Sequence, residues 1–527
     1  MSYSSQGAEY ARASLPALLV ACALTLAATL CAIALGPGEE GYFDSAFYLD
    51  GARHLAHGNG FVCALTQPES SALGPITRWA PGFSLLIAAG IALGLTPLSA
   101  ASAVLGASYV LAVLCVFVLG LQLAGKRAWL WSLTAALSFA VSPSVLAAMN
   151  SLLSDLPFAT VALLGVGLAL RLCSGRPASF MLRGAFGAAL VGMVLMRYAG
   201  AFFAAGALLA VALCMPHASL WSRARSLWPS AAIFVAGLAG WVGRNRYVDT
   251  EPFGARTFER TDPWLQLDRA LGGALTWPKE LLQLADATGA ATAANVLLGA
   301  AALSLPVLLW RSSTHTRRQV ALLTLPVLTY FALMVATASA MHFDPIGSPR
   351  FWLPVSALGQ LLALSLAVRS QGRLARWLRW LPILSMLCAI GLFARDLEQA
   401  RATAHQARGL LQPRWQAAAA ALPDARACHL FISDARPFML HRELGPTSQI
   451  PLTLAELESA LSTHERSCIA VVSKRLRLSS TAERRRGAQD EVIAALQREG
   501  RLDQLANEAG ITLFRVRRGV EGVRSDN

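Results

Sequence analysis

Long apolar runs, separated by short polar segments, fill most of this 527-residue chain. Each run is about 17–25 residues long, the length at which an α-helix crosses about 30 Å of hydrocarbon. Because one soluble core could not bury so many runs, we expect an α-helical polytopic membrane protein. The pattern predicts about eleven spans, at 15–35, 99–124, 128–147, 153–172, 180–196, 198–214, 227–243, 291–310, 319–339, 351–369 and 380–395.

One further apolar segment, 80–97, is interpreted as an interfacial or re-entrant helix. Proline and glycine limit it at both ends, in Trp79-Ala80-Pro81-Gly82 and in Thr96-Pro97. Counting it as a span would invert every later segment and put the basic pair Lys126-Arg127 on the outer side. We therefore expect it to be a juxtamembrane helix in a long outward loop, 36–98; a second long outward loop is expected at 244–290.

After Arg395 the sequence has ordinary polarity. Short apolar runs at Cys428–Ser433, Ser467–Ser473 and Ile511–Val516 predict buried strands, and Leu454–Ser462 and Ala488–Arg498 have the pattern of amphipathic helices. The chain is thus expected to consist of a multi-span domain, 1–395, and a small α/β domain, 396–527. Cys428 and Cys468 each begin a predicted strand, so a disulfide there is one open possibility if the domain is periplasmic.

Charge gives the orientation. Only 14% of the residues are charged, against about 25% in soluble proteins. With the N-terminus inside, the inward segments hold a single acid, Glu9, and 15 basic residues: Arg12, Lys126, Arg127, Arg171, Arg176, Arg183, Arg223, Arg225, Arg311, Arg317, Arg318, Arg369, Arg373, Arg376 and Arg379. This positive-inside pattern is typical of a bacterial inner (plasma) membrane protein, and an odd span count puts the C-terminal domain in the periplasm.

The net charge of +14 does not point to a nucleic-acid partner. The basic surplus lies mainly in the membrane part, and no compact basic patch with interleaved aromatic residues is present.

The first outward loop carries the first group of candidate residues. Asp44 and Tyr48 follow the first span, and His54 and His57 precede the helix-ending run Gly58-Asn59-Gly60. An acid on a short helix at the membrane surface could take part in catalysis. A solvated interfacial loop is the alternative.

The second group lies at the outward ends of later spans. Asp155 begins a span, and a charge so close to hydrocarbon indicates a functional site unless it only caps the helix. The other members are Arg197, Arg244, Asn245, Arg246, Asp344 and Arg350. Outward arginines run against the positive-inside bias, so they call for an anionic partner; snorkelling to lipid phosphate is the alternative.

These segments together resemble the C-type glycosyltransferases, in particular the branch with protein O-mannosyltransferases, aminoarabinose transferases and the bacterial RgtA/B/C/D-like enzymes. The resemblance covers residues 15 to about 395. It rests on Asp44 with Tyr48 and Gly58-Asn-Gly60-Phe61, Trp79-Ala-Pro81-Gly-Phe83, Pro143 with Ser154-Asp155-Leu-Pro157-Phe158, Arg244-Asn245, and Asp344 with Arg350 and Pro354.

The resemblance implies transfer of a sugar from a polyprenyl-phosphate donor to a lipid, glycan or protein acceptor at the outer face of the membrane, with inversion. Asp44 would be the catalytic base. Arg197, Arg244, Arg246 and Arg350 would bind the donor phosphate, whose negative charge grows as the glycosidic bond breaks. The remaining candidates, expected to contact substrate, are Tyr48, Asp155, Asn245 and Asp344.

No cofactor is required, because arginines can stabilise a monophosphate leaving group. A divalent metal held by Asp44, His54, His57 or Asp155 stays open as an alternative.

Two other classes of function remain. A transporter or flippase of a lipid-linked or small anionic substrate would have a similar number of spans, but internal repeats and midplane polar residues are typical of that class. Here the charges gather on one face and no repeat is evident. A structural subunit whose C-terminal domain binds a partner is the third reading.

The topology can be tested by cysteine accessibility. Lys126→Cys is expected to react with a membrane-impermeant thiol reagent only from inside, and Asp155→Cys only from outside, because the charge bias orients the intervening spans. The opposite labelling pattern would overturn the orientation.

Overall fold

The computed structural model describes most of the chain. The described residues are 3–36, 42–66, 73–124, 129–175, 178–216, 219–249, 253–254, 260–276, 314–341, 344–369, 416–417, 419–420, 422, 429–433, 436–442, 444, 447–451, 453–463, 467–472, 480–508 and 511–517. The spans predicted at 291–310 and 380–395 lie outside them. The chain divides into two compact units. Unit 1 contains 1–38, 77–83 and 102–406, and unit 2 contains 39–76, 84–101 and 407–527.

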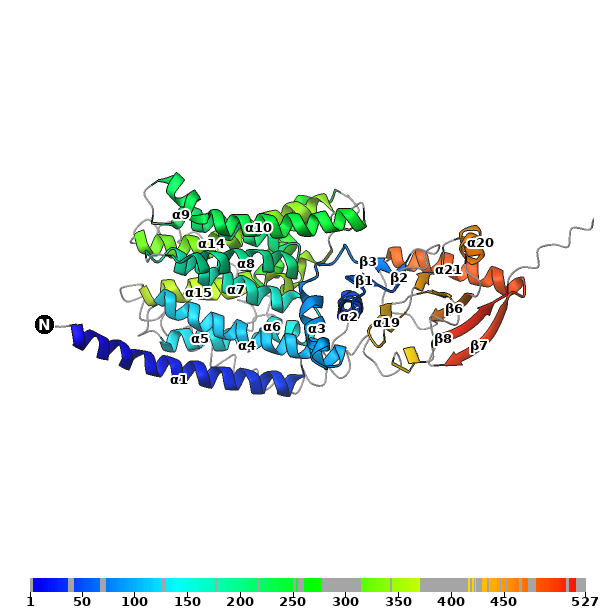
Figure 1. The fold of residues 1–527 in the computed structure, drawn as a ribbon, viewed down its shortest axis with the longest axis horizontal. Helices are drawn as coiled ribbons and strands as arrows, with labels where there is room; N and C mark the ends of the chain where they lie inside the picture. The colour runs from blue at the N-terminus through cyan, green and yellow to red at the C-terminus, as the bar shows by residue number, and fades with distance from the viewer. Residues whose placement is uncertain are drawn as a thin grey trace, which may run out of the picture. The chain divides into compact units, whose positions relative to one another are not determined.

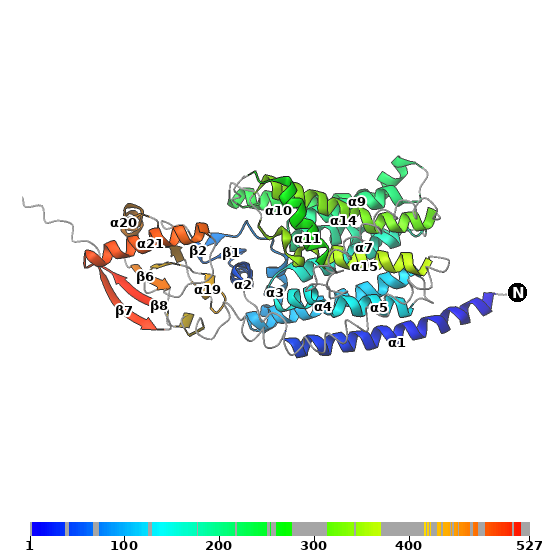
Figure 2. The same cartoon turned by 180° about the vertical axis from the view of Figure 1, so that it is seen from behind.

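Unit 1 is a bundle of apolar helices (Figures 1 and 2). Its described helices are α1 (Tyr3–Leu35), α4 (Pro97–Ala124, unit 1 from Ser102), α5 (Trp129–Ala140), α6 (Pro143–Asn150), α7 (Asp155–Leu172), α8 (Phe180–Met196), α9 (Gly200–Cys214), α10 (Leu220–Val248), α11 (Pro263–Ala274), α14 (Thr314–Ala340) and α15 (Leu353–Arg369). Two 3₁₀ turns, η2 (Asp344–Gly347) and η3 (Pro349–Trp352), precede α15. Within the bundle α9 packs against α14, and α8 packs against both α7 and α10.

The predicted spans that fall on described residues coincide with helices of the bundle, although 128–147, predicted as one span, is divided into α5 and α6. By length and composition, four described helices could cross a membrane, or five if the pair α5 and α6 forms one bent span, and further apolar helices are shorter. The pair bends by 53° where Pro143 begins α6, because proline lacks the N–H that would continue the preceding helix. The protein is therefore membrane-embedded.

The segment interpreted as re-entrant is too short to span. Its helix, α3 (Gly82–Ala92), has 11 residues, about 16 Å at 1.5 Å per residue. The turn that follows α3 contains Gly94, whose φ of 91° is one that other residues rarely adopt.

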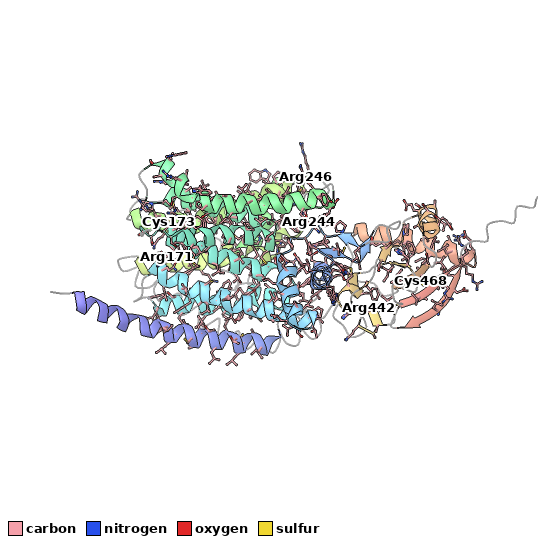
Figure 3. The ribbon with its side chains drawn as sticks, in the orientation of Figure 1. Arg171, Cys173, Arg244, Arg246, Arg442 and Cys468 are labelled. Carbon is pink, nitrogen blue, oxygen red and sulfur yellow. The ribbon has the colours of Figure 1, made fainter. Side chains whose placement is uncertain are left out.

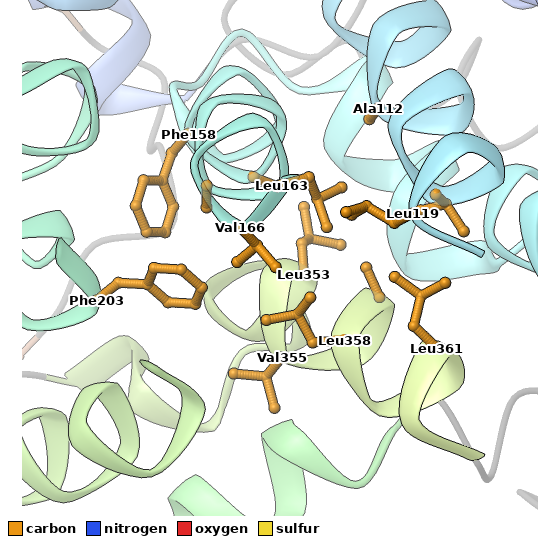
Figure 4. Packing of buried hydrophobic residues seen from close by; sticks show 14 of the residues in the cluster. Ala112, Leu119, Phe158, Leu163, Val166, Phe203, Leu353, Val355, Leu358 and Leu361 are labelled. Atoms are coloured by element: carbon orange, nitrogen blue, oxygen red, sulfur yellow. The ribbon is translucent and has the colours of Figure 1, made fainter. Parts of the chain in front are cut away.

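Large apolar side chains and small residues alternate in the core of unit 1. Figure 4 shows Phe158 and Phe203 beside Val166 and Leu353, and all four are buried. Gly206 on α9 lets α14 approach closely, since a Cβ there would lie 2.7 Å from the Pro326 Cα. The close contact between these two helices therefore depends on glycine.

Unit 2 combines helix α2 (Phe43–Ala56), from the long loop predicted after the first span, with a C-terminal sheet. A short hairpin pairs β1 (Val62–Cys63) with β3 (Gly74–Pro75). The sheet has six strands in the order β2-β5-β4-β6-β8-β7, with β2 (Leu65–Thr66), β4 (His429–Ile432), β5 (Thr447–Gln449), β6 (Ser467–Val472), β7 (Leu502–Glu508) and β8 (Ile511–Val516). Strands β2, β5, β4 and β6 pair in parallel, and β8 and β7 continue antiparallel.

Helices α19 (Arg436–Met439), α20 (Leu454–Thr463) and α21 (Ser480–Arg498) complete unit 2. Apolar side chains of α20 and α21 pack on the sheet, and Leu457, Leu496 and Phe431 are buried there. The three predicted strands and two predicted helices are present, although α21 begins eight residues earlier than Ala488. One edge strand, β2, comes from the first loop, so unit 2 is built from segments on both sides of the expected boundary at 395 and 396.

One described cysteine is in a disulfide, and the others are free thiols, including Cys63 in unit 2. Cys468 at the centre of the sheet is disulfide-bonded, while Cys428 lies outside the described residues. The described cysteines of unit 1 carry free thiols; they are Cys22, Cys31, Cys115, Cys173 and Cys214.

Gly206→Val is expected to destabilise the protein by about 1–3 kcal/mol, because overpacking displaces α14. The thermal unfolding midpoint in detergent should fall by several degrees. Gly240→Val is the matched control, since a Cβ there meets nothing within 4 Å. Equal midpoints for the two variants would show that close packing of α9 and α14 does not matter.

Candidate functional site

An ion pair joins two of the predicted site residues in unit 1. Asp155 is the first residue of α7, and Arg197 follows the last residue of α8 in an extended conformation. The Arg197 guanidinium pairs with the Asp155 carboxylate, which is only 3% exposed. The preceding Ser154 makes no capping hydrogen bond to the helix. Asp155 therefore binds Arg197, in addition to any capping role at the start of α7.

A second arginine, Arg350, lies near Arg197 because both pack on the ring of Phe351. The Arg197 Cζ lies 4.0 Å from the centroid of the Phe351 ring, and the Arg350 Cζ lies 5.2 Å from it. Two guanidinium groups thus share one ring, and Asp155 pairs with the first of them. Cations bind aromatic faces favourably.

Buried packing fixes that ring. The Tyr330 hydroxyl donates to the Phe351 carbonyl at 3.0 Å, and Tyr330 contacts the Trp352 ring edge-on at 5.7 Å. Trp352 in turn donates its Nε1–H to the Ile346 carbonyl at 2.9 Å. Turn η3, which carries Arg350, is therefore anchored to α14 and η2 by hydrogen bonds and aromatic packing.

Tyr198, next to Arg197, is the centre of a hydrogen-bond network. Its hydroxyl donates to the Thr77 carbonyl at 2.7 Å, and the Trp79 carbonyl lies 3.2 Å away. It accepts from Trp241 Nε1 at 3.0 Å and from Asn245 Nδ2 at 3.3 Å. The network ties the start of α9, the end of α10 and the segment 77–79 together, and so limits the movement of Arg197.

Arg244 and Asn245 belong to this network, whereas Arg246 points elsewhere. Asn245 is fully buried, and its Oδ1 accepts from Arg244 Nη1 at 3.0 Å. The Arg244 Cζ lies 5.1 Å from the Trp241 ring. Arg246 is exposed, because residues two apart on a helix do not share a face. Figure 3 shows Arg244 and Arg246 near the end of α10.

A further contact holds the same end of α10. The Thr77 hydroxyl donates to Asp249 Oδ2 at 2.7 Å. Gly254 has a φ of 73°, and a Cβ there would lie 2.6 Å from the Arg78 Cα. The turn at 253–254 can pack on the backbone of Arg78 only because it has glycine.

In unit 2, Asp44 lies in the first turn of α2 and is half-buried. The helix start is fixed by a reciprocal cap: the Tyr42 N–H donates to Ser45 Oγ at 2.9 Å and the Ser45 N–H donates to the Tyr42 carbonyl at 3.1 Å. Tyr48, one turn on, is buried, and its carbonyl accepts from Ser84 Oγ at 2.9 Å. The Asp44 carboxyl group is thus held on a helix whose first turn is fixed by hydrogen bonds.

The interior of α2 also holds charge. Asp50 is fully buried and its Oδ2 accepts from the Ala64 N–H at 2.8 Å; the same oxygen lies 3.8 Å from His54 Nε2. Burial, with the nearby Asp50 charge, raises the pKa of the Cys63 thiol to about 12. Cys63 is therefore a protonated, unreactive thiol near neutral pH.

The two histidines of the first loop do not share an environment. His54 is buried and His57 is exposed. Across the described residues, no three His, Cys, Asp or Glu side chains gather in a way that could hold a metal ion. Asp344 begins η2, and its side chain lies outside what the structure describes.

Several residues of these hydrogen-bond and aromatic contacts are not predicted as site residues from the sequence. They are Asp50, Thr77, Tyr198, Trp241, Asp249 and Phe351. Tyr198 and Phe351 each adjoin a predicted arginine, so an aromatic residue next to an outward arginine was the available signal. Asp50 looked like one more acid in a polar loop.

No family model matches the sequence, and no curated protein matches it either. Solved structures do match the fold. ArnT from Cupriavidus metallidurans in the apo state has a TM-score of 0.57 at 14% identity, over 95% of this chain and 98% of that chain. The same protein bound to undecaprenyl phosphate gives 0.56 at 14% identity, over 94% and 97%.

The oligosaccharyltransferase of Archaeoglobus fulgidus in the apo form matches with a TM-score of 0.50 at 14% identity, over 85% of this chain and 69% of that chain. Both neighbours are C-type glycosyltransferases. The chain therefore has the fold of this class, as its sequence motifs predict.

Tyr198→Phe should destabilise the protein by about 1–3 kcal/mol, because Asn245, fully buried, and Trp241 both donate to the lost hydroxyl. A thermal unfolding midpoint in detergent measures the effect. Tyr247→Phe is the control, since Tyr247 is 91% exposed. If both variants unfold at the wild-type temperature, the hydroxyl does not organise the site.

Proposed function

We propose that this protein transfers a sugar from a polyprenyl-phosphate donor to a lipid, glycan or protein acceptor at the outer face of a bacterial inner membrane, with inversion at the anomeric carbon. The single observation that carries the proposal is the gathering of Asp155, Arg197 and Arg350 around Phe351. The fold supports it, because a protein of this fold, ArnT, has been solved with undecaprenyl phosphate bound.

A lipid phosphate is the anion that this arrangement suits. Arg197 and Arg350 lie over the same Phe351 ring, and both sit where a bundle helix begins or ends. Charge-assisted hydrogen bonds from guanidinium groups to phosphate oxygens are short and strong. Arg244, held by Asn245, is a further candidate for this role. Arg246, which is exposed, would meet the phosphate only at the rim of such a site.

Asp44 is the proposed general base. In the reaction, the acceptor oxygen forms a bond to the anomeric carbon and its proton passes to the Asp44 carboxylate. The bond from the anomeric carbon to the phosphate oxygen breaks, and the polyprenyl phosphate leaves with one more negative charge. Guanidinium groups stabilise that charge as it develops. Because the acceptor attacks directly, the configuration is inverted.

The other candidates have supporting roles in the proposal. Asp155 and Asn245 fix the arginines with which they pair. Tyr48 and Asp344 are proposed substrate contacts, as expected from the sequence. The divalent metal alternative draws no support from the buried His54 and exposed His57.

A periplasmic location for residues 396–527 fits the positive-inside charge pattern. It also fits the disulfide of Cys468, because disulfides persist in oxidising compartments. Among the alternatives, a transporter or flippase has less support, since the fold matches glycosyltransferases and the charges gather at helix ends.

The function is tested with purified full-length protein and a panel of undecaprenyl-phosphate-linked pentoses and hexoses, by measuring released undecaprenyl phosphate. Asp44→Asn is expected to reduce turnover by about 10²–10⁴-fold, the contribution of a general base. Its unfolding midpoint should stay at the wild-type value. Asp268→Asn, which removes an exposed acid on α11, is the control. Full activity of the Asp44 variant, or no turnover of any donor by the wild type, would contradict the proposal.

A further inference from the structure

Arg53 on α2 is buried, whereas a charged residue on a helix in a solvated loop would be exposed. Its side chain is only 6% exposed. It reaches the C-terminal part of unit 2, where Nη2 donates to the Leu440 carbonyl at 2.7 Å. Nη1 donates to the Met439 carbonyl and to the Arg442 carbonyl, the latter at 3.2 Å. One guanidinium group therefore binds three backbone carbonyls of the turn that follows α19.

That turn is itself fixed by a second arginine. Arg442 Nη1 donates to the carbonyls of Ala419 and Leu422, each at 3.0 Å. Met439 and Leu440 are buried. Buried carbonyls need hydrogen-bond donors, and a charged donor makes a stronger bond than a neutral one. The contact of α2 with the turn 439–442 is thus specific and anchored at both ends.

A second connection between α2 and the C-terminal sheet is independent of Arg53. Ala64 bonds to both elements. Its N–H donates to Asp50 on α2, and the Ala64 carbonyl accepts from the Thr447 N–H on β5 at 2.8 Å. Strand β2 continues this pairing, with Leu65 opposite Thr447. Gly51 faces Phe61 and Ile76, and a Cβ at Gly51 would lie 2.8 Å from each. Helix α2 is therefore held on two sides within unit 2.

We propose that the turn 439–442 and strand β5 form a brace that holds α2 in place, and that Arg53 is a positioning residue for Asp44. This inference rests on the proposed function, in which Asp44 is the base. Asp44 and Arg53 lie on one helix, about 14 Å apart along its axis. A base must lie within about 2.6–3.2 Å of the proton that it takes. A shift of α2 by 1 Å can cost about 100-fold in rate. The C-terminal residues thus have a role in catalysis without touching substrate.

The first test measures hydrogen exchange in the full-length protein. Arg53→Ala is expected to raise amide exchange in peptides from 43–56 at least tenfold, and Arg53→Lys less, because lysine can still donate to some of the carbonyls. Peptides of α7 in unit 1 should not change. Arg498→Ala, which removes an exposed arginine of α21, is the matched control. If amide exchange in 43–56 is unchanged in Arg53→Ala, the proposal that α2 is held by this brace is wrong, whatever activity the variant has.

The second test compares kinetics with the donor that the wild type turns over. Arg53→Ala should lower kcat by about 10–100-fold with the donor KM within about threefold, and Arg53→Lys should recover part of the loss. In an Asp44→Asn background, Arg53→Ala should add little, because both changes act on one step. If Asp44→Asn is inactive but Arg53→Ala keeps the wild-type kcat, the inference fails alone. If Asp44→Asn is active, the proposed function fails first.

Discussion

Charge is costly beside hydrocarbon, and this constraint accounts for the way the candidate site is built. A buried arginine or aspartate without a partner would destabilise the bundle by several kcal/mol. Arg197 is paired with Asp155, lies over Phe351, and adjoins a tyrosine that makes hydrogen bonds to the segment 77–79 and to α10. Each of these contacts holds a cation at the end of a helix rather than within it. The packing of unit 1 therefore brings arginines together at helix ends, where we propose that a lipid phosphate binds.

A second constraint organises unit 2. With 14 residues, α2 has a length at which an isolated helix is marginal in water. In unit 2 it is held by Arg53, which donates to carbonyls of 439–442, and by Ala64, which bonds both to Asp50 on α2 and to Thr447 on β5. A candidate base is thus carried by a helix whose order depends on residues far away in the chain. The sheet, in turn, gains an edge strand from the loop.

The spans were predictable because lipid imposes a long apolar run on each, and the bend before α6 could be anticipated at Pro143. The strands of the C-terminal sheet with apolar sequences were predictable as well. Strand β7, with the polar sequence Leu502–Glu508, and the two-residue strand β2 lack any hydrophobic alternation, so only their partners define them.

The site was predictable as a set of residues rather than as an arrangement. Asp155 and Arg350 are predictable as charges near apolar runs. Their partners are not, because the pairing of Arg197 with Asp155 and with Phe351 depends on how α7, α8 and η3 pack together. The role of Arg53 is not predictable either: its three acceptors are backbone carbonyls about 390 residues away, and backbone acceptors do not depend on side-chain identity.

The arginines around Phe351 are proposed to bind a lipid phosphate. The most direct measurement is the Kd of undecaprenyl phosphate for the purified protein and for Arg350→Ala, with the unfolding midpoint recorded for both. We expect the Kd to rise by about 10–100-fold, the value of one or two charged hydrogen bonds, at an unchanged midpoint. Equal affinity of the two proteins, or a loss of stability as large as the loss of binding, would contradict the account.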